Sequence, residues 1–262
     1  MNRPTLSVIV ITKNEAELIG QCLESVKWAD EIVVVDSGSQ DATVAICRRY
    51  TDKVVVTDWP GFGPQKNRAL ALATGDWVLS IDADEQVTPD LAEEIRTTLA
   101  DTPHHVFKLP RLSSFMGRHI RHGDWWPDEI VRLFRRGHAR FSDDLVHERL
   151  VHQAPAARLK HLLLHQSTRS IEQLIGKVNT YTSGGAARVR AAGKACGLGT
   201  AITHALWAFV RGYVFKRGFL DGREGFIIAV SVAENSFYKY VKASYLPPAN
   251  RPDPNMATAD RP

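Results

Sequence analysis

The sequence predicts an α/β fold: a mostly parallel, mixed sheet with helices on both faces, followed by a helical extension. Strand and helix patterns alternate through the first hundred residues, as repeated β-α-β units require. From residue 170 the pattern is helical and rich in Ala, Gly and aromatic residues. The two sequence patterns predict a sheet-forming part and a separate helical part.

The elements of the first part follow from apolar periodicity. The continuous apolar run at 6–11 predicts a strand buried on both faces, and the i, i+3, i+4 spacing within 15–26 predicts a helix. Thr88, followed by Pro89, marks another helix start. The remaining elements are expected as strands at 31–35, 53–57 and 77–81 and as helices at 41–50, 65–73 and 88–100.

The rest of the chain divides into segments with different sequence patterns. Residues 106–151 alternate strand patterns with long polar connections, which predicts an antiparallel extension of the sheet. The final sixteen residues contain five prolines and few large apolar groups, which favours disorder. The expected organisation is a first domain at 1–168 with halves 1–100 and 101–168, a helical part at 169–246 and a disordered tail at 247–262.

The composition limits the classes of protein to which the chain can belong. The chain has 262 residues, of which 44% are hydrophobic and 24% charged, as in globular domains. Three cysteines are too few and too scattered for a disulfide framework or a cysteine-based zinc site. The first apolar run is too short for a secretory leader, and no run reaches the roughly 20 residues of a membrane span. We expect a cytoplasmic protein.

Two carboxylates follow the apolar strand at 77–81. Asp82 and Asp84 flank Ala83, with Glu85 next. Carboxylate oxygens suit Mg²⁺ or Mn²⁺, and such an ion would neutralise a diphosphate. The alternative is a solvated acidic turn that caps the next helix, which would be the better interpretation of an isolated D-x-D. The preceding strand and a second acidic strand end favour the metal site.

The second acidic strand end is the segment VVVDSGSQDAT at 33–43. Asp36 could accept hydrogen bonds from a base or ribose, and Ser37 begins a stretch of small residues that lets backbone N–H groups approach a ligand. The alternative is a strand–turn–helix connection with an Asx-type cap. No GxGxxG segment follows the first strand, so a dinucleotide-binding unit is not supported.

Together these segments resemble the family 2 glycosyltransferases of GT-A fold. The resemblance rests on SVIVITKNE, EIVVVDSGSQDAT and GFGPQKNRALALATGDWVLSIDADE, which agree in order and spacing over about residues 5–100. It implies a nucleotide-sugar donor (a UDP-sugar is favoured), a divalent metal and an inverting displacement. It also implies that Asp84 ligates the metal. The residues implied to bind the nucleotide-sugar are Thr12, Asn14, Glu15, Asp36, Ser37, Gln65, Lys66, Asn67, Asp82 and Ala83.

A narrower resemblance lies downstream. The segments WWPDEIVRLFRR, LVHERL and GYVFKRGFLDGREGFIIAV are similar to those of small bacterial transferases of lipopolysaccharide core assembly, which add a β-1,4-glucosyl residue to an inner-core heptose. This resemblance implies a hexose, with glucose favoured, and a lipid-linked glycan acceptor. A different acceptor, such as another polysaccharide, a lipid carrier or a protein, stays open.

An inverting transfer needs a general base beside the acceptor hydroxyl. We expect Glu148 in this role, with Asp128 as the alternative; a strand-end salt bridge is the structural alternative for Glu148. The histidines show no paired metal-ligand spacing, and His165 is expected at a core edge. Acceptor or phosphate contacts are expected from Trp125, Trp126, Arg132, Arg135 and His147.

The helical part is basic and aromatic. Residues 169–242 contain eleven Lys or Arg and four acidic residues, a local excess of +7 against +4 for the chain. Interleaved aromatic residues predict a peripheral contact with an anionic membrane, with Trp207 and Phe215 at the acyl boundary. The alternatives are a helical cover for the sheet and, from another class, a basic nucleic-acid-binding protein. The latter leaves both acidic strand ends without a role, so we expect no nucleic acid partner.

Overall fold

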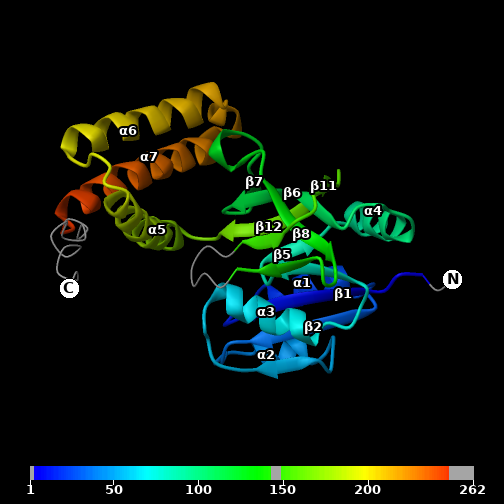
Figure 1. Ribbon diagram of the computed structural model, residues 1–262. Helices are drawn as coiled ribbons and strands as arrows, with labels where there is room; N and C mark the ends of the chain where they lie inside the picture. The colour runs from blue at the N-terminus through cyan, green and yellow to red at the C-terminus, as the bar shows by residue number, and fades with distance from the viewer. Residues whose placement is uncertain (1–2, 143–148, 248–262) are drawn as a thin grey trace, which may run out of the picture. The chain divides into compact units, whose positions relative to one another are not determined.

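The computed structural model describes residues 3–142 and 149–247 in two compact units (Figure 1). Unit 1 comprises residues up to 114 together with 127–167, and unit 2 comprises 115–126 together with the chain from 168. The segment 115–126, which the sequence analysis places in the first domain, therefore belongs to the helical unit. The predicted tail at 247–262 lies, apart from Pro247, outside the described residues.

The sheet of unit 1 has the strand order β3-β2-β1-β4-β8-β6-β12-β5. Strands β1, β2, β3 and β4 run parallel, while β8 is antiparallel to both β4 and β6, and β12 is antiparallel to β5. This confirms the predicted mixed, mostly parallel α/β sheet. The strands are β1 (Leu6–Thr12), β2 (Glu31–Asp36), β3 (Val54–Val56), β4 (Trp77–Asp82), β5 (Glu85–Val87), β6 (Val106–Phe115), β8 (Glu129–Arg135) and β12 (Leu163–Thr168).

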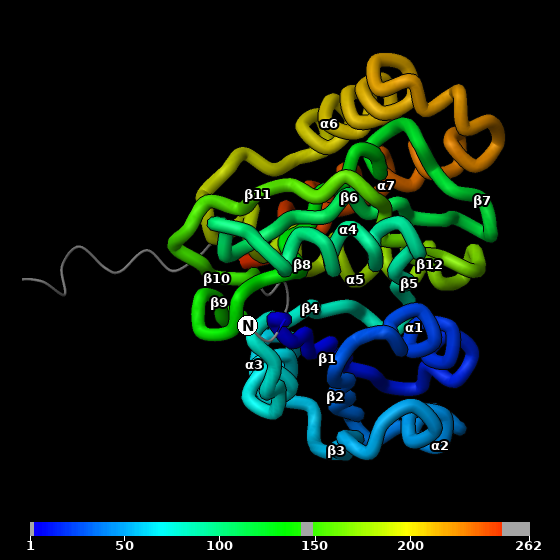
Figure 2. Tube along the Cα trace, turned by 90° about the vertical axis from the view of Figure 1, so that its right-hand side faces the viewer, coloured from blue at the N-terminus to red at the C-terminus, as the bar shows by residue number. Residues whose placement is uncertain are grey.

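Helices cover both faces of the sheet because side chains of the central strands alternate between two cores. In β1, Val8 and Val10 pack in one core, while Ile9 and Ile11 pack in the other. Figure 2 shows α3 on one side of β1 and β2, with α1 and α2 on the other. The helices of unit 1 are α1 (Ile19–Val26), α2 (Thr43–Cys47), α3 (Phe62–Leu72) and α4 (Pro89–Ala100).

Three of the predicted helices differ from those observed. The helix expected within 15–26 begins only at Ile19. The helix expected at 41–50 extends only over Thr43–Cys47, because a tight turn in which Tyr50 N–H donates to the Cys47 carbonyl (3.0 Å) follows at once. The helix expected at 65–73 begins earlier, at Phe62, after Gly61 adopts φ 115°. That backbone conformation favours glycine, which explains why the start carries no ordinary cap.

Glu31, the first residue of β2, joins neighbouring segments of unit 1. Its carboxylate accepts hydrogen bonds from Ser7 and from the backbone and hydroxyl of Thr74 (2.8 Å each), and it forms an ion pair with Lys53. Burial raises the pKa of Glu31, but these donors outweigh it and lower the pKa to about 2.

Shorter strands complete the sheets: β7 (Arg118–His119), β9 (Ala139–Phe141), β10 (Leu150–His152) and β11 (Ala157–Arg158). β9 and β10 form a separate antiparallel pair. Asn67 of α3 fixes β9, because its amide exchanges two hydrogen bonds of 2.9 Å with the backbone of Phe141.

Unit 2 is built from helices. They are η1 (Gly123–Trp125), α5 (Ile171–Ala191), α6 (Leu198–Val210), η2 (Arg211–Phe215, a π-helical turn), η3 (Gly218–Asp221) and α7 (Gly222–Tyr245). The helical part expected at 169–246 thus contains three long helices, α5, α6 and α7. A Cβ on Gly225 would lie 2.0 Å from the Gly218 carbonyl oxygen, so α7 packs directly against backbone at that point. None of the helices in the described ranges has the length and hydropathy that a bilayer span requires.

Candidate functional site

The acidic strand ends lie side by side at one edge of the sheet. The parallel register pairs Thr12 with Asp36 across β1 and β2, and Ile11 with Asp82 across β1 and β4. Ligands of open α/β sheets bind outside the carboxyl ends of such strands. The positions that the resemblance implies for the donor and the metal therefore lie on neighbouring strand ends, and their roles stay a prediction.

The loops after β1 and β2 are cross-linked. Asn14 has φ 54°, its N–H donates to Ser39 Oγ, and its Oδ1 accepts from the Gln40 N–H, both at 2.8 Å. The Glu15 N–H donates to Thr43 Oγ1 at 2.8 Å. The two loops therefore hold each other in place.

Asp36 organises the second loop from within. Its carboxylate is fully buried and accepts N–H bonds from Gly38 (2.9 Å) and Ser39 (2.8 Å) as well as the Ser39 hydroxyl. The next residue, Ser37, accepts a bond from Gln65 Nε2 at 2.9 Å. These bonds form the turn named as the structural alternative for Asp36, and the predicted direct contact with a nucleoside stays a prediction.

Asp82 lies between two cations. Lys66 Nζ is 3.0 Å from its Oδ1, and the Arg132 guanidinium pairs with its Oδ2. Burial raises the pKa of Asp82, but the charges of Arg132 and Lys66 outweigh it and hold the pKa far below its usual range. Asp82 is therefore ionised at any physiological pH, with both oxygens engaged.

Glu85 extends this charge cluster inward. Its carboxylate is fully buried, lies 3.0 Å from Arg132 and 3.2 Å from Arg111, and accepts the Asp82 N–H at 2.9 Å. Arg111 Nε in turn lies 2.8 Å from Asp128. Burial lowers the pKa of Arg132, yet Asp82 and Glu85 outweigh it and raise that pKa. A chain of alternating charges thus links the strand end to Asp128, a candidate base.

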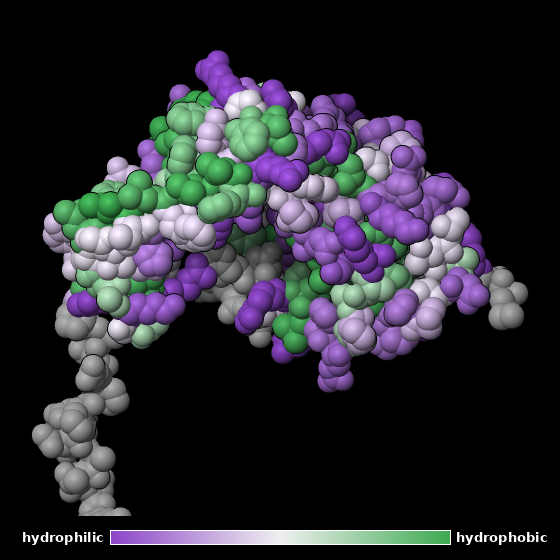
Figure 3. Space-filling model, turned by 90° about the horizontal axis from the view of Figure 1, so that it is seen from above, coloured by the Kyte–Doolittle hydropathy of each residue, from purple (hydrophilic) through white to green (hydrophobic). Residues whose placement is uncertain are grey.

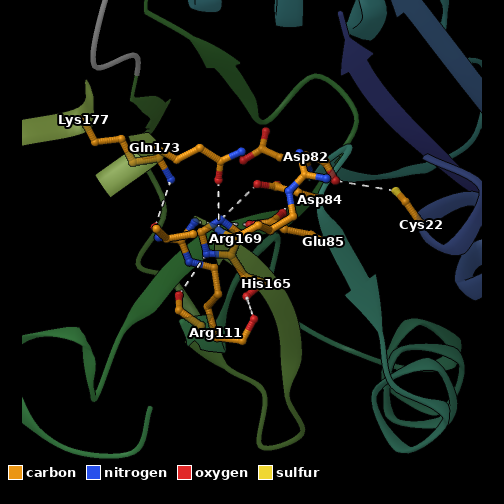
Figure 4. Close-up of polar contacts among 12 residues, drawn as sticks. Cys22, Asp82, Asp84, Glu85, Arg111, His165, Arg169, Gln173 and Lys177 are labelled. Carbon is orange, nitrogen blue, oxygen red and sulfur yellow. Dashed lines mark hydrogen bonds and ion pairs between the residues drawn. The ribbon is translucent and has the colours of Figure 1, made fainter. Parts of the chain in front are cut away.

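Asp84 faces a histidine. Its Oδ2 lies 3.3 Å from His165 Nε2, and the other ring nitrogen of His165 is 2.9 Å from Ser113 Oγ (Figure 4). A carboxylate oxygen and an imidazole nitrogen this close together could both bind one Mg²⁺ or Mn²⁺ ion. The carboxylate, the imidazole and the hydroxyl that orients the imidazole fit such an ion. Within the described ranges, no group of three or more His, Cys, Asp or Glu side chains could hold a metal alone.

His165, which the sequence predicts at a core edge, is largely buried and also faces Asp84. The residue lies 81 positions beyond Asp84, and the antiparallel pairing of β12 with β5 brings the two together. In the sequence His165 follows His161 by four residues, a spacing that core-edge histidines show more often than ligands do. The position of His165 beside Asp84 follows only from the pairing of β12 with β5.

The remaining predicted residues lie in several places. Ala83 is buried between the two aspartates, Arg132 is buried in the charge cluster and Arg135 is exposed at the end of β8. Trp125 and Trp126 belong to unit 2. Glu148 and His147 lie outside the described residues.

Comparison with known proteins identifies a family and several relatives. The family model described as "Glycosyl transferase family 2" matches residues 7–158. A relative from Rickettsia felis, named an uncharacterized glycosyltransferase, is 31% identical over 253 residues, covering 90% of this chain and 88% of the relative. The lipopolysaccharide core biosynthesis glycosyltransferase LpsC of Rhizobium meliloti is also 31% identical, over 186 residues, covering 68% of this chain and 69% of the relative.

One of the solved structures that match does so over less than half of this chain. Glucosyl-3-phosphoglycerate synthase from Mycobacterium tuberculosis, in complex with Mg²⁺ and uridine diphosphate, is 26% identical over 42% of this chain and 44% of its own, with a TM-score of 0.36.

Proposed function

The chain belongs to glycosyltransferase family 2, and we propose that it moves a hexose, glucose by preference, with inversion from a UDP-sugar to a lipid-linked glycan such as a lipopolysaccharide inner-core heptose. The relative LpsC, named for lipopolysaccharide core biosynthesis, supports this acceptor class, as do the downstream segments quoted above. A glycosyltransferase with another acceptor uses the same site, so the acceptor is the part of the proposal that an experiment must decide.

The observation that carries the proposal is the different environment of the two aspartates. Asp82 has both oxygens engaged by Lys66 and Arg132, whereas Asp84 faces the imidazole of His165. One carboxylate is fixed in place by its salt bridges, and the other is paired with a second ligand for a hard cation.

We assign the metal-binding role to Asp84 and His165. A divalent cation bound there would neutralise the charge that develops on the leaving diphosphate. Ser113 orients the imidazole, so that Nε2 points toward Asp84. Lys66 and Arg132 hold Asp82 in a fixed position, where its backbone lies next to that of Ile11.

The donor would lie along the cross-linked loops. Nucleobase and ribose would contact Thr12, Asn14, Glu15 and the loop that Asp36 organises, with Gln65 and Lys66 beneath. Thr12 supports this placement, because its Oγ1 is buried with no hydrogen-bond partner in the structure. A buried, unpaired hydroxyl is costly unless a ligand satisfies it.

The acceptor hydroxyl attacks the anomeric carbon while a base takes its proton, and the bond to the diphosphate breaks on the opposite face. We propose Glu148 as this base. Asp128 is the second candidate, and one observation favours it: Arg111 holds its carboxylate at 2.8 Å and leaves it 31% exposed. An acceptor embedded in a bilayer requires the enzyme at that surface, so we propose peripheral attachment to the cytoplasmic membrane face.

Thermal unfolding with nucleoside diphosphates tests the donor and metal together. UDP with Mn²⁺ should raise the midpoint more than UDP or Mn²⁺ alone, because each ligand completes the site of the other. GDP and ADP serve as matched controls. Equal shifts for all nucleotides, or shifts indifferent to Mn²⁺, would contradict the assignment. Transfer from UDP-[14C]glucose to purified inner-core lipid then tests the sugar and the acceptor.

A further inference from the structure

Helix α6 of unit 2 has small residues inside and large apolar residues outside. Ala201 and Ala208 are its buried residues. Leu198, Ile202, Leu206 and Val210, spaced four apart, are exposed to 65%, 44%, 63% and 38%. A helix that packs on a protein core in water shows the opposite distribution, with large apolar residues inward and polar residues outward.

No charge interrupts this outer face. Residues 195–210 contain no Asp, Glu, Lys or Arg. The exposed apolar surface continues past the helix through Val214 (50%) and Phe215 (66%) to Phe219 (48%). Hydrophobic side chains cover the face over α6 in Figure 3. An exposed apolar surface of this extent marks an interaction site.

Cations flank the apolar face at both ends. Lys194 precedes it, and Arg211, Lys216 and Arg217 follow, within a stretch whose net charge is +7. Two of these cations form ion pairs with Asp124, whose carboxylate lies 3.0 Å from Arg211 Nη2 and 2.8 Å from Lys216 Nζ. These pairs fix the turn after α6, so the free positive charge at this end is smaller than the sequence indicates.

We propose that α6 and the turn through Phe219 lie in the boundary between headgroups and acyl chains of an anionic bilayer, with the Leu198–Val210 face toward the lipid. The inference rests on the proposed function only in that a lipid-linked acceptor supplies the reason for attachment. Thirteen residues span about 20 Å, which is shorter than the ~30 Å hydrocarbon core, so the helix lies along the surface.

The charge distribution favours lipid over a second copy of the chain. A dimer through this face would bring two units of like charge together, whereas anionic headgroups complement the cations at both ends. Small residues at a helix–helix contact with large apolar residues outward are also typical of helices that face lipid. Attachment is therefore mainly hydrophobic, with a smaller electrostatic part, and raising the salt concentration should weaken it only in part.

The test is flotation with vesicles of phosphatidylethanolamine and phosphatidylglycerol, using the full chain. The double variant Ile202→Gln, Leu206→Gln should lower the partition coefficient at least tenfold, because two large apolar side chains lose their transfer into lipid. Leu72→Gln, which changes a similarly exposed apolar residue of unit 1, should leave binding unchanged. Trp207→Phe should remove a blue shift of tryptophan emission that vesicles induce in the parent.

Three outcomes would overturn the proposal: no vesicle binding by the parent, binding equal in the double variant, or a parent dimer that the double variant dissociates. The last would place a second copy on α6. UDP-induced thermal stabilisation is measured on the same proteins without vesicles. Vesicle binding without UDP stabilisation would refute the proposed UDP-sugar donor and leave this inference standing. UDP stabilisation without vesicle binding would refute this inference and the peripheral attachment, and leave the proposed donor standing.

Discussion

Helices α1 and α6 each carry an apolar face, but their large apolar side chains point in opposite senses, inward in α1 and outward in α6. In α1, Ile19, Cys22, Leu23 and Val26 are all buried against the sheet. In α6 the buried positions are alanines, and the large side chains face outward. A helical period shows which residues share a face, but not whether that face meets protein or lipid. We assign catalysis to unit 1 and attachment to the membrane to unit 2.

The largest expected effect tests whether catalysis takes place in unit 1. Asp84→Asn should abolish transfer, lowering turnover by about a thousandfold or more, because an amide removes the anionic ligand while keeping its shape. The Mn²⁺-dependent part of UDP binding should vanish in calorimetry, while vesicle flotation stays at the parent level. Asp90→Asn, an exposed carboxylate on α4, is the control. Turnover near that of the parent would remove Asp84 from the site.

Truncating one leucine in each helix compares α1 and α6 directly. Leu23→Ala should reduce the free energy of unfolding by about 3 kcal/mol, because it leaves a cavity in a close-packed core. Leu206→Ala should change it by less than about 0.5 kcal/mol in water, because that side chain is already exposed. Urea unfolding of both variants measures the difference. Similar losses would mean that protein packs on the outer face of α6.

Variants of the candidate base should affect turnover without affecting vesicle binding. Glu148→Gln should lower kcat roughly a hundredfold with the donor KM and vesicle binding unchanged. Asp128→Asn should be milder. Steady-state kinetics with saturating donor decide between them, and a larger loss for Asp128→Asn would move the base to the residue held by Arg111.

Acidification should affect the sheet of unit 1 through Glu31. Its pKa is lowered to about 2, so its stabilising contribution is complete above the unfolded value near 4.5 and is lost as pH falls toward 2. Glu31→Gln should cost on the order of 2 kcal/mol at pH 7, and the gap to the parent should narrow between pH 4.5 and 2. Urea unfolding at several pH values measures this. A constant gap would contradict the assignment.

The features that depend on neighbouring residues in the sequence could be predicted. The parallel strands and the clustering of Asn14, Asp36, Asp82 and Asp84 at one edge follow from apolar runs and the polar residues that end them. Lys66, a partner of Asp82, was among the residues predicted for the site. The pairing of Arg132 with Asp82 and of His165 with Asp84 could not be predicted, because both partners lie on antiparallel strands far along the chain. The exposed aromatic residues of unit 2 were predicted from composition, but the ion pairs of Asp124 with Arg211 and Lys216 were not.

The cross-linked loops after β1 and β2 have a calorimetric consequence. Asn14, Ser39 and Thr43 already hold both loops without a ligand, so donor binding orders little additional chain. The heat-capacity change of UDP binding should then reflect only the surface that the nucleotide itself buries, without the large negative contribution of coupled folding. The conformational entropy of these loops is lost once, when the polypeptide folds, and not again at each turnover.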